Sequence, residues 1–483
     1  MNSQIRRLYL ALTLMVLALM LALTYHAFID APRLYANDYN RRVTDAYWGQ
    51  ERGKIVAGQL ILAQSVPTGT GVNASYQRSY PQGEHYAHIT GYFPAAVHGQ
   101  VTELEKEAGS VLSGKSDAQW LQRLQDLFIG SQPRGGNVSL TIDPKIQEAC
   151  VQALHGQTGA AVALNPATGE ILGMYSAPSF NPNTLSGADG KQVLDNYQAL
   201  RSNPGKPLMN RAISQLYPPG STFKIVTAAA LLSSGQIQPD TEVDAPTTLP
   251  LPNTNVTLSN YGGYPCGNGK VPFRFAFAQS CNTPFAQLGM NLGGKALQDQ
   301  AKRFGFATSV QIPMPGVASQ FPLPEAPSFL ANAAIGQQSV RVTPLQMAMV
   351  AAAVANRGMV MKPYLINQDL SSDFQVVQQH APQELGRAVS PQVAADLNTL
   401  MQEVVKTGSG KAAAIPGITV AGKTGTAQTG IASGQDLWFV GFAPAEAPRI
   451  AVAVVIEDPQ GIRGTGAHTV APLAQRILQA GVS

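Results

Sequence analysis

The chain has 483 residues, and its 33 lysines and arginines exceed its 29 aspartates and glutamates by a formal net charge of only +4. Charged residues make up 13% and hydrophobic residues 45% of the chain, whereas soluble domains contain roughly 25% charged residues. This composition excludes a globally disordered chain, and the absence of a lysine- or arginine-rich block argues against a nucleic-acid-binding protein. At roughly 150 residues per domain, the length predicts two or three folded units.

The N-terminus carries an apolar segment, residues 8–24, directly after Arg6 and Arg7. About 20 residues of helix cross the hydrocarbon core of a bilayer, so this segment predicts a transmembrane anchor. Arginines before such a segment favour a cytoplasmic N-terminus, which places everything after Asp30 outside the cell. The alternative is a signal peptide cleaved near residues 34–36, but a signal peptide has an apolar core of only roughly 7–15 residues.

Three cysteines occur, at Cys150, Cys266 and Cys281. Cys150 lies on the apolar stripe of a predicted helix, so we expect it to be a buried small hydrophobic residue. Oxidation outside the cell would permit a disulfide between Cys266 and Cys281. The sequence leaves open whether these two are bridged or remain free thiols.

A polar segment rich in turn-forming residues, 132–136, predicts a domain boundary. It divides the chain into a cytoplasmic tip with the anchor, a small mixed domain and a larger C-terminal domain, at residues 1–30, 31–134 and 135–483. In the small domain, strand-like pieces at 54–55 and 59–62 precede a predicted helix at 118–128. No motif or titratable cluster in the small domain indicates chemistry.

The larger domain has strand patterns near both of its ends and helical patterns between and after them. The strand patterns are residues 159–164, 170–176, 438–442 and 450–456. Two helical patterns are clearest, one over residues 344–356 with Thr343 as its N-cap and one over residues 471–480. Strands from both sequence ends with helices inserted between them predict an α+β fold, in which helices flank an antiparallel sheet.

The first candidate for chemistry is Ser221, which opens a predicted helix after a Pro-Pro-Gly turn. Free N–H groups and the helix dipole at that position favour developing negative charge. Lys224 lies one turn further on the same face of a helix that is apolar all round. Burial would lower the pKa of Lys224, and the neutral amine would then act as a base toward Ser221. Taken alone, the pair is too short to be specific, and an ordinary helix with a serine N-cap and a surface-reaching lysine explains it better.

The second candidate is Ser280-Cys281-Asn282, which directly precedes a predicted helix start at Thr283-Pro284. These residues are therefore expected in a loop between two helices. The serine offers a hydroxyl for proton relay, and the asparagine offers an amide that can hold a peptide backbone.

The third candidate is Lys423-Thr424-Gly425-Thr426, which follows the β-branched run 418–420. Gly425 on a strand would let a ligand approach the backbone closely. Lys423 and the two threonines are suited to receive a carboxylate.

In this order, the three segments resemble the motifs of the penicillin-binding proteins and serine β-lactamases. Residues 135–483 are similar to class B penicillin-binding proteins, and the small domain resembles the short pedestal of the group called penicillin-binding protein A in actinobacteria. The wider resemblance is carried by residues 52–55, 80–81, 88–92, 177–182, 210–212, 217–224, 335–337, 343–346 and 438–444. Two departures stand out: the Asp-Arg that commonly follows residues 52–55 is missing, and Gln338 occupies a position where glycine is frequent.

The resemblance implies a serine D,D-transpeptidase that cross-links peptidoglycan stem peptides at their C-terminal D-Ala-D-Ala and is acylated by penicillins and other β-lactams. Ser221 would attack the peptide carbonyl while Lys224 accepts its proton. Ser280 would pass that proton to the departing D-alanine, and Asn282 would position the donor peptide.

The resemblance also assigns the substrate-binding strand. Lys423 would add positive charge near Lys224, Thr424 and Thr426 would bind the terminal carboxylate, and Gly425 would let the substrate approach. The backbone N–H groups of Ser221 and Thr426 would form the oxyanion hole. No metal or cofactor is implied. The expected partners are the membrane and other cell-wall or division proteins, among them a glycosyltransferase, since the small domain is too short to polymerise glycan.

A rival interpretation uses the same lysine, because the segment from Gly417 to Lys423-Thr424 formally satisfies the Walker A pattern of nucleotide hydrolases. A P-loop, however, needs a helix that begins at Gly-Lys-Thr. Residues 418–420 are instead strand-like, and residues 425–430 are a poor helix start, so we expect this match to be accidental.

Other enzyme classes fit less well. The seven histidines are scattered and no Gly-x-Ser-x-Gly elbow occurs, which argues against a Ser-His-Asp hydrolase and against a metal site. A soluble β-lactamase would need neither the anchor nor the additional N-terminal domain. A sensor or scaffold that binds penicillin without turnover remains an alternative, and only an assay with a peptide donor and an amine acceptor separates it from the enzyme.

Overall fold

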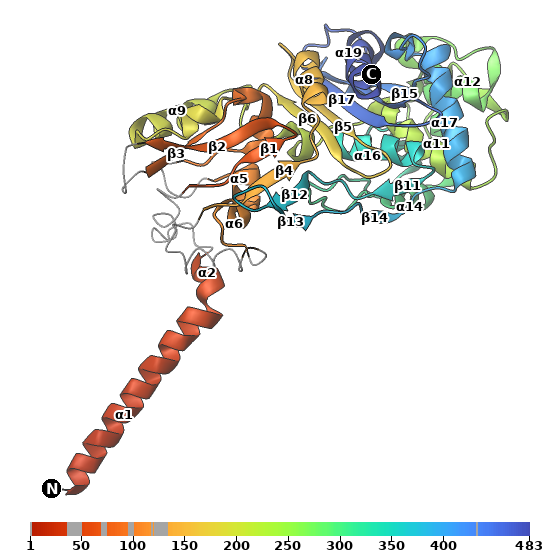
Figure 1. Ribbon diagram of the computed structural model, residues 1–483. Coiled ribbons are helices and arrows are strands. Elements are labelled where there is room, and N and C mark those ends of the chain that lie inside the picture. Colours follow the sequence, from red (N-terminus) through yellow and green to blue (C-terminus); the bar gives the residue numbers. More distant parts are fainter. Residues whose placement is uncertain are drawn as a thin grey trace.

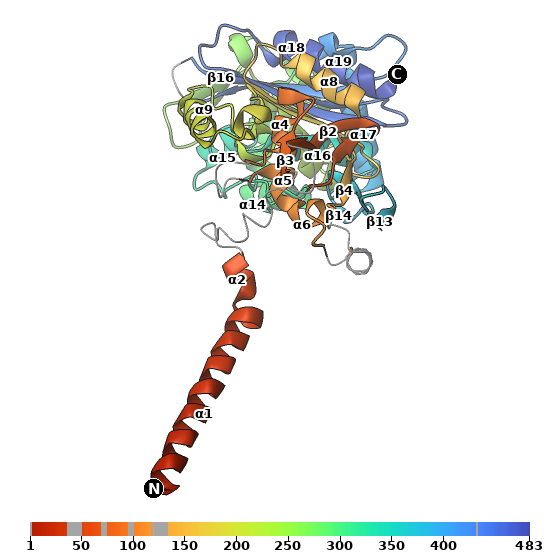
Figure 2. The ribbon, with the colours of Figure 1, turned by 60° about the vertical axis from the view of Figure 1, so that its left-hand side comes forward.

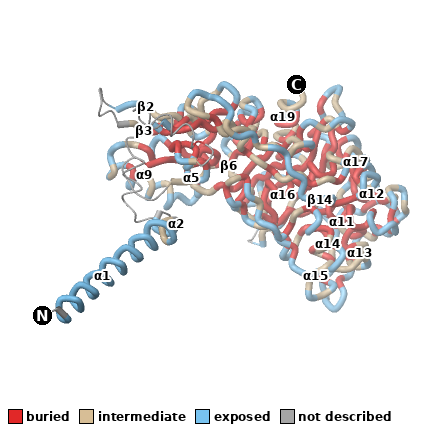
Figure 3. Tube along the Cα trace, turned by 60° about the horizontal axis from the view of Figure 1, so that its bottom comes forward, coloured by how far each residue is buried: buried red, intermediate tan, exposed pale blue. Residues whose placement is uncertain are grey.

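The computed structural model describes residues 2–35, 51–68, 75–94, 101–116, 119, 134–430 and 433–483. At the N-terminus, α1 (Asn2–Thr24) continues into a π-helical turn, η1 (Tyr25–Ile29), and a short helix, α2 (Ala31–Tyr35). The span Ser3–Ile29 is long and apolar enough to cross a membrane, and its most apolar window is not buried against any other part of the chain. Figure 1 shows this helix extending away from the rest of the molecule, and Figure 3 colours its residues as exposed. Apart from Gln119, the predicted helix at 118–128 lies outside the described residues.

A five-stranded antiparallel sheet forms the centre of the larger domain. Its strand order is β15-β16-β17-β5-β6, with β15 (Ala421–Gln428), β16 (Gln435–Ala443), β17 (Ile450–Asp458), β5 (Gly159–Leu164) and β6 (Ile171–Ala177). Both predicted strand pairs are therefore confirmed, and β17 joins them by pairing with β5. The run 418–420 is not part of β15, because Ile418 bonds back to Ile415 in a turn before the strand begins.

Both faces of this sheet are covered by helices, which confirms the predicted α+β fold. On one face of the sheet lies α16 (Pro344–Ala355), and α11 (Lys224–Ser233) belongs to the same core. On the other face, α8 (Pro144–Ala153) and α19 (Ala471–Val482) pack against each other (Figure 2). Successive strand residues alternate between the two cores, so that Trp438 joins the α16 side and Phe439 the α19 side. Because both faces are buried, the strands have continuous apolar runs instead of polar alternation.

Two helices around this sheet begin with side-chain caps, and the predicted cap at Thr343 is confirmed. The Asp143 side chain accepts from the backbone N–H of Lys145 at 2.8 Å at the start of α8, and Thr343 Oγ1 accepts from the N–H of Gln346 at 3.2 Å at the start of α16. Cys150 on α8 is completely buried and free, as its position on the apolar stripe predicts.

A six-stranded sheet lies beside this core, and its strands come from both halves of the chain (Figure 1). The order is β13-β12-β4-β1-β2-β3, with β13 (Val376–Gln379), β12 (Ile366–Leu370), β4 (Asn137–Leu140), β1 (Ile55–Ala57), β2 (Leu60–Thr68) and β3 (Ser75–Ser79). Strand β4 pairs in parallel with β1, and β12 pairs antiparallel with β4. Residues far along the chain therefore extend the sheet that the small domain begins.

A buried charged cluster, for which the sequence has no local signal, holds the small domain together. The carboxylate of Glu105 pairs with Arg52 at 2.9 Å and with Arg78 at 2.5 Å, and all three side chains are almost completely inaccessible. The two arginines favour the charged carboxylate and hold the pKa of Glu105 below its ordinary value although burial opposes this. Such an interior cluster of paired charges fixes the packing of the domain.

The remaining described elements surround the two large sheets. The helices are α4 (Ala87–Thr90), α5 (Glu103–Glu107), α6 (Gly109–Leu112), α9 (Gly190–Ser202), α10 (Arg211–Ser214), α12 (Phe273–Ala278), α13 (Asn282–Leu292), α14 (Gly294–Arg303), α15 (Pro327–Ala333), α17 (Pro391–Lys406) and α18 (Gly466–Thr469). The strands form two-stranded ladders, namely β7 (Glu242–Ala245) with β10 (Gly269–Pro272), β8 (Thr248–Pro250) with β9 (Thr257–Ser259), and β11 (Met359–Met361) with β14 (Glu384–Arg387).

Candidate active site

Ser221 lies in a single 3-10 turn, η5 (Gly220–Phe223), that leads directly into α11. Gly220 has a φ of +52°, and a Cβ there would lie 2.9 Å from the Cβ of Ala427, so only glycine lets the turn approach β15 this closely. The turn is held from two further sides. The indole N–H of Trp438 donates to the Pro218 carbonyl at 3.0 Å, and the Gly220 N–H donates to the Gly336 carbonyl at 2.9 Å.

Lys224 begins α11 and is completely buried, as the apolar helix predicts. Its ammonium donates to the backbone carbonyl of Ser280 at 2.8 Å and to Oδ1 of Asn282 at 2.7 Å. Burial, and then the nearby charge of Lys423, hold the pKa of Lys224 well below its ordinary value. A lysine in this setting releases its proton easily and is suited to act as a base.

Ser280 and Cys281 lie between α12 and α13, as predicted. Asn282, which was also expected in this loop, is instead the first residue of α13. Ser280 adopts a φ of +61°, a left-handed conformation that non-glycine residues rarely take. In that conformation its carbonyl, not its hydroxyl, receives the hydrogen bond from Lys224.

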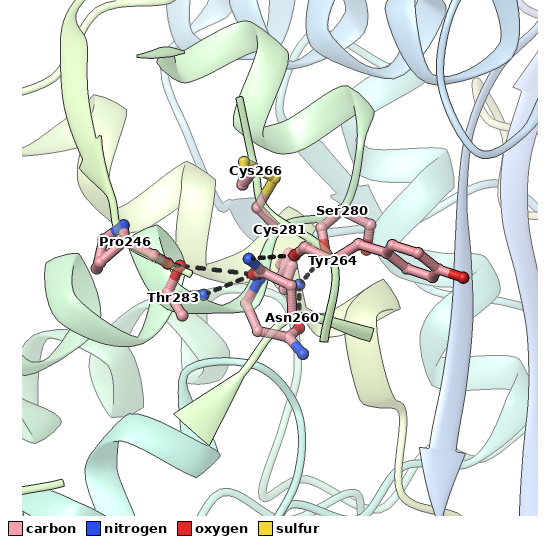
Figure 4. The surroundings of a disulfide bond; sticks show 9 residues. Pro246, Asn260, Tyr264, Cys266, Ser280, Cys281 and Thr283 are labelled. Carbon is pink, nitrogen blue, oxygen red and sulfur yellow. Dashed lines mark hydrogen bonds between the residues drawn. A yellow bond between two sulfur atoms is a disulfide. The ribbon is translucent and has the colours of Figure 1, made fainter. Parts of the chain in front are cut away.

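Cys266 and Cys281, which the sequence left open as bridged or free, form a disulfide (Figure 4). Their Cα atoms are 6.0 Å apart. The bridge ties the middle residue of the second motif to a loop formed by residues 260–267. The expected oxidising environment is consistent with such a bridge.

The third motif occupies the middle of β15, which is an edge strand of the sheet. Lys423 is completely buried, and burial lowers its pKa to about 7. The Thr424 hydroxyl lies 2.6 Å from that of Ser409, and the Thr426 hydroxyl accepts from the Gly466 N–H at 3.3 Å. Gly425 lies on the strand as predicted, and a Cβ there would lie 3.0 Å from the Pro219 carbonyl oxygen.

The strand at Lys423 also decides against the Walker A interpretation. A P-loop lysine is followed at once by a helix that points its N–H groups at phosphate. In this chain the backbone stays extended through Lys423 and Thr424 as far as Gln428. The segment therefore lacks the phosphate-cradling geometry.

A cavity of about 1250 Å³ brings the three motifs together. Its lining includes Ser221, Ser280, Asn282, Thr424, Gly425 and Thr426. The two buried lysines, Lys224 and Lys423, are the basic residues of these motifs and lie beneath that lining. Within the part of the chain that the structure describes, no group of three or more histidine, cysteine or acidic residues is arranged to hold a metal.

The cavity also has walls that the three motifs do not predict. The loop from Asn260 to Cys266 forms one wall, with Tyr261 and Tyr264 exposed on it, and Ser409, Thr465 and His468 form part of the others. His468, one of the seven scattered histidines, lies exposed on α18 beside the cavity. None of these residues has a local sequence signal, because their proximity to Ser221 is created by the fold.

Comparison with known proteins finds two family models that match this chain. A family model described as "Penicillin binding protein transpeptidase domain" matches residues 159–479, and one described as "Penicillin binding protein A dimerisation domain" matches residues 52–138. The "Peptidoglycan D,D-transpeptidase PbpA" of Mycolicibacterium smegmatis is 39% identical over 496 residues, which cover 99% of both chains. The protein of the same name from Mycobacterium tuberculosis is also 39% identical, again over 99% of both chains.

Solved structures agree with this relationship. The ceftriaxone acyl-enzyme complex of penicillin-binding protein A from M. tuberculosis superposes with a TM-score of 0.86 at 39% identity, covering 91% of this chain and 100% of that chain. Its penicillin G acyl-enzyme complex superposes with a TM-score of 0.84 at 39% identity, covering 90% of this chain and 100% of that chain.

Proposed function

The chain belongs to the class B penicillin-binding protein transpeptidases and is a peptidoglycan D,D-transpeptidase, and on this basis we propose that Ser221 is the nucleophile that carries the acyl group. One observation supports this assignment above the others. Ser221 faces the cavity at the start of a helix, three residues before a completely buried lysine whose pKa is strongly lowered. β-Lactams acylate the same serine in place of the stem peptide.

In the proposed reaction, neutral Lys224 takes the proton of Ser221 Oγ as that oxygen attacks the carbonyl carbon between the two terminal D-alanines. Backbone N–H groups of Ser221 and Thr426 stabilise the oxyanion that forms. The C–N bond then breaks, the terminal D-alanine leaves as an amine with the transferred proton, and an ester remains on Ser221. The amine of a second stem peptide attacks this ester, which restores the Ser221 hydroxyl and forms the cross-link.

Proton delivery to the leaving amine is assigned to Ser280. Since the Ser280 carbonyl receives the Lys224 N–H, this step requires the hydroxyl to turn toward Lys224 when substrate binds. Asn282 already bonds Lys224 through Oδ1, so its amide is placed to align lysine and donor peptide together.

The donor peptide binds along β15 in this proposal. An edge strand offers one row of unpaired backbone groups, which an extended peptide can complete. The terminal carboxylate of the donor is received by Thr424 and Thr426, with the charge of Lys423 beneath them. Gly425 keeps the strand open to the substrate.

A transfer assay tests the proposed function. The full chain in detergent is incubated with a D-alanyl donor thioester and a D-amino-acid acceptor, and hydrolysis and transfer products are separated. We expect transfer product from the wild-type protein and none from Ser221→Ala. Penicillin labelling without any turnover of the donor would support the sensor or scaffold alternative and contradict the proposal.

For the remainder of the chain, we propose that residues 1–30 anchor the protein, with its N-terminus in the cytoplasm and the cavity outside the cell. The two arginines directly before the uncharged apolar run 8–24 support this orientation. We further propose that residues 31–134 form a non-catalytic pedestal that contacts other membrane proteins of cell-wall synthesis or division. A protease-protection experiment on spheroplasts tests the orientation, since the cavity domain is expected to be digested from outside.

A further inference from the structure

The helix that carries Asn282 begins without a cap of its own. The first N–H groups of a helix need acceptors, which the side chain of the N-cap residue usually supplies. In α13 the N-cap residue is Cys281, which makes no capping hydrogen bond because its sulfur is bonded to Cys266. The acceptor for this helix must therefore come from elsewhere in the chain.

Asn260 supplies it from the neighbouring loop (Figure 4). Its Oδ1 accepts from the backbone N–H of Asn282 at 2.7 Å and from that of Thr283 at 3.2 Å. Its Nδ2 donates in the other direction, to the Tyr264 carbonyl at 3.2 Å. The side chain is only 8% exposed and lies directly after β9, so it is held firmly between the loop and the helix.

The same helix start holds the lysine of the first motif. The N–H of Asn282 bonds Asn260, while its side chain donates to the Ser259 carbonyl at 3.1 Å and accepts from Lys224 Nζ at 2.7 Å. We propose that Asn260 is a positioning residue for the acyl-transfer reaction, which fixes the start of α13 and thereby the place of the Lys224 amine relative to Ser221. This inference rests on the proposed function, in which Lys224 is the base.

A purely structural cap and a positioning residue differ in what they change. A structural cap affects the melting temperature alone, whereas a positioning residue acts on the chemical step. Asn260 is itself part of the cavity wall, but its truncation would leave Ser221 and residues 424–426 of the lining in place while misplacing the Lys224 amine. Acylation by penicillin separates recognition from chemistry. The dissociation constant of the non-covalent penicillin complex and the first-order rate of acylation within it are measured independently.

The test uses the full chain in detergent with a fluorescent penicillin and three variants. Asn260→Ala removes the acceptor. Asn260→Asp keeps the acceptor oxygen but removes the donor to Tyr264. Asn203→Ala is the matched control, since Asn203 makes an equivalent side-chain bond to the Gly205 N–H, at 2.8 Å, on an exposed loop away from the cavity.

We expect Asn260→Ala to lower the acylation rate about 10-fold or more while the dissociation constant changes by less than about 3-fold. Asn260→Asp is expected to recover most of that rate, and Asn203→Ala to match the wild type. If Asn260→Ala does not fold, Asn260→Ser, with a shorter acceptor, carries the same comparison. A folded Asn260→Ala or Asn260→Ser protein with an unchanged acylation rate, or no recovery in Asn260→Asp, would overturn the inference. Absence of labelling at Ser221 in the wild type would instead overturn the proposed function.

Discussion

Lys224 and Lys423 are both completely buried, and the charge of Lys423 lowers the pKa of Lys224 beyond the effect of burial. Among the ion pairs of the described residues, none joins either lysine to a carboxylate. Two buried ammonium groups without a counter-ion disfavour each other's charge. This pairing therefore favours the neutral form of Lys224.

The pair predicts a shift in the pH profile of acylation when Lys423 is removed. Lys423 has a pKa of about 7, so it is charged mainly below that pH and there disfavours protonation of Lys224. In Lys423→Met the pKa of Lys224 rises, and the acidic limb of the acylation rate moves to higher pH. The rate of penicillin labelling, followed from roughly pH 5 to roughly pH 9, measures the position of this limb. As a control, Lys411→Met removes an exposed lysine at the same cavity and should leave the acidic limb in place, because solvent screens its charge. An acidic limb that does not move in Lys423→Met would contradict the coupling between the two lysines.

The same substitution predicts a gain in stability. The folded protein lowers the pKa of Lys423 to about 7 from an ordinary value of 10.5, so between these values the unfolded chain binds the additional proton and stability rises with pH. Lys423→Met removes this cost and should raise the melting temperature by about 2–4 °C at pH 7. The gain should shrink toward pH 10, where the unfolded lysine also loses its proton. Calorimetry at both pH values checks the direction, and a gain that grows with pH would argue against a buried neutral lysine.

The Cys266–Cys281 bridge closes a loop with a sequence separation of 15. Cross-links of that length stabilise the folded state by about 3 kcal/mol through the unfolded chain. We therefore expect Cys266→Ser/Cys281→Ser to melt lower than the wild type and to lose its response to reductant. Intact mass before and after reduction should differ by two hydrogen atoms. Cys150→Ala should keep the response to reductant, and a wild-type mass that does not change would show that the thiols are free.

The contacts around Gly425 indicate that β15 must lie close to η5, the turn that carries Ser221. A Cβ at this position would lie 3.0 Å from both the Pro219 carbonyl oxygen and Thr222 Cγ2. Gly425→Ala is therefore expected to separate the strand from the turn and to slow acylation by about 10- to 100-fold, because small misplacements of reacting groups have large effects on rate. The control Gly187→Ala adds a Cβ with an ordinary 3.7 Å contact and should acylate normally. Equal rates for the two variants would show that this approach is not needed.

Local signals in the sequence were sufficient for much of the fold. Asp143 and Thr343 cap their helices because each stands directly before an apolar helix with a proline at its first position. Four strands of the central sheet, β5, β6, β16 and β17, were recognisable as short apolar runs bounded by turn residues. The fifth, β15, was not, because the strand-like run 418–420 lies in a turn before it. The site motifs were recognisable through their order along the chain and their resemblance to a known family.

Contacts between distant residues had no such signal. Arg52, Arg78 and Glu105 meet in the interior although 26 and 27 residues separate them in turn. Strand β12 joins the sheet of the small domain by pairing with β4, far earlier in the chain. A single asparagine at position 260 resembles any loop asparagine until the fold brings it to the start of α13. These arrangements depend on tertiary packing, which neither periodicity nor spacing encodes.

The central claim is that Ser221 is acylated with Lys224 as its base, and peptide mapping of the penicillin-labelled full chain tests it most directly. Wild-type protein should carry one penicillin, located by mass spectrometry on the peptide that contains Ser221. Lys224→Ala should fold but lose labelling by about 10²- to 10⁴-fold, the usual contribution of a general base. An adduct on any other residue, or undiminished labelling of Lys224→Ala, would contradict the account.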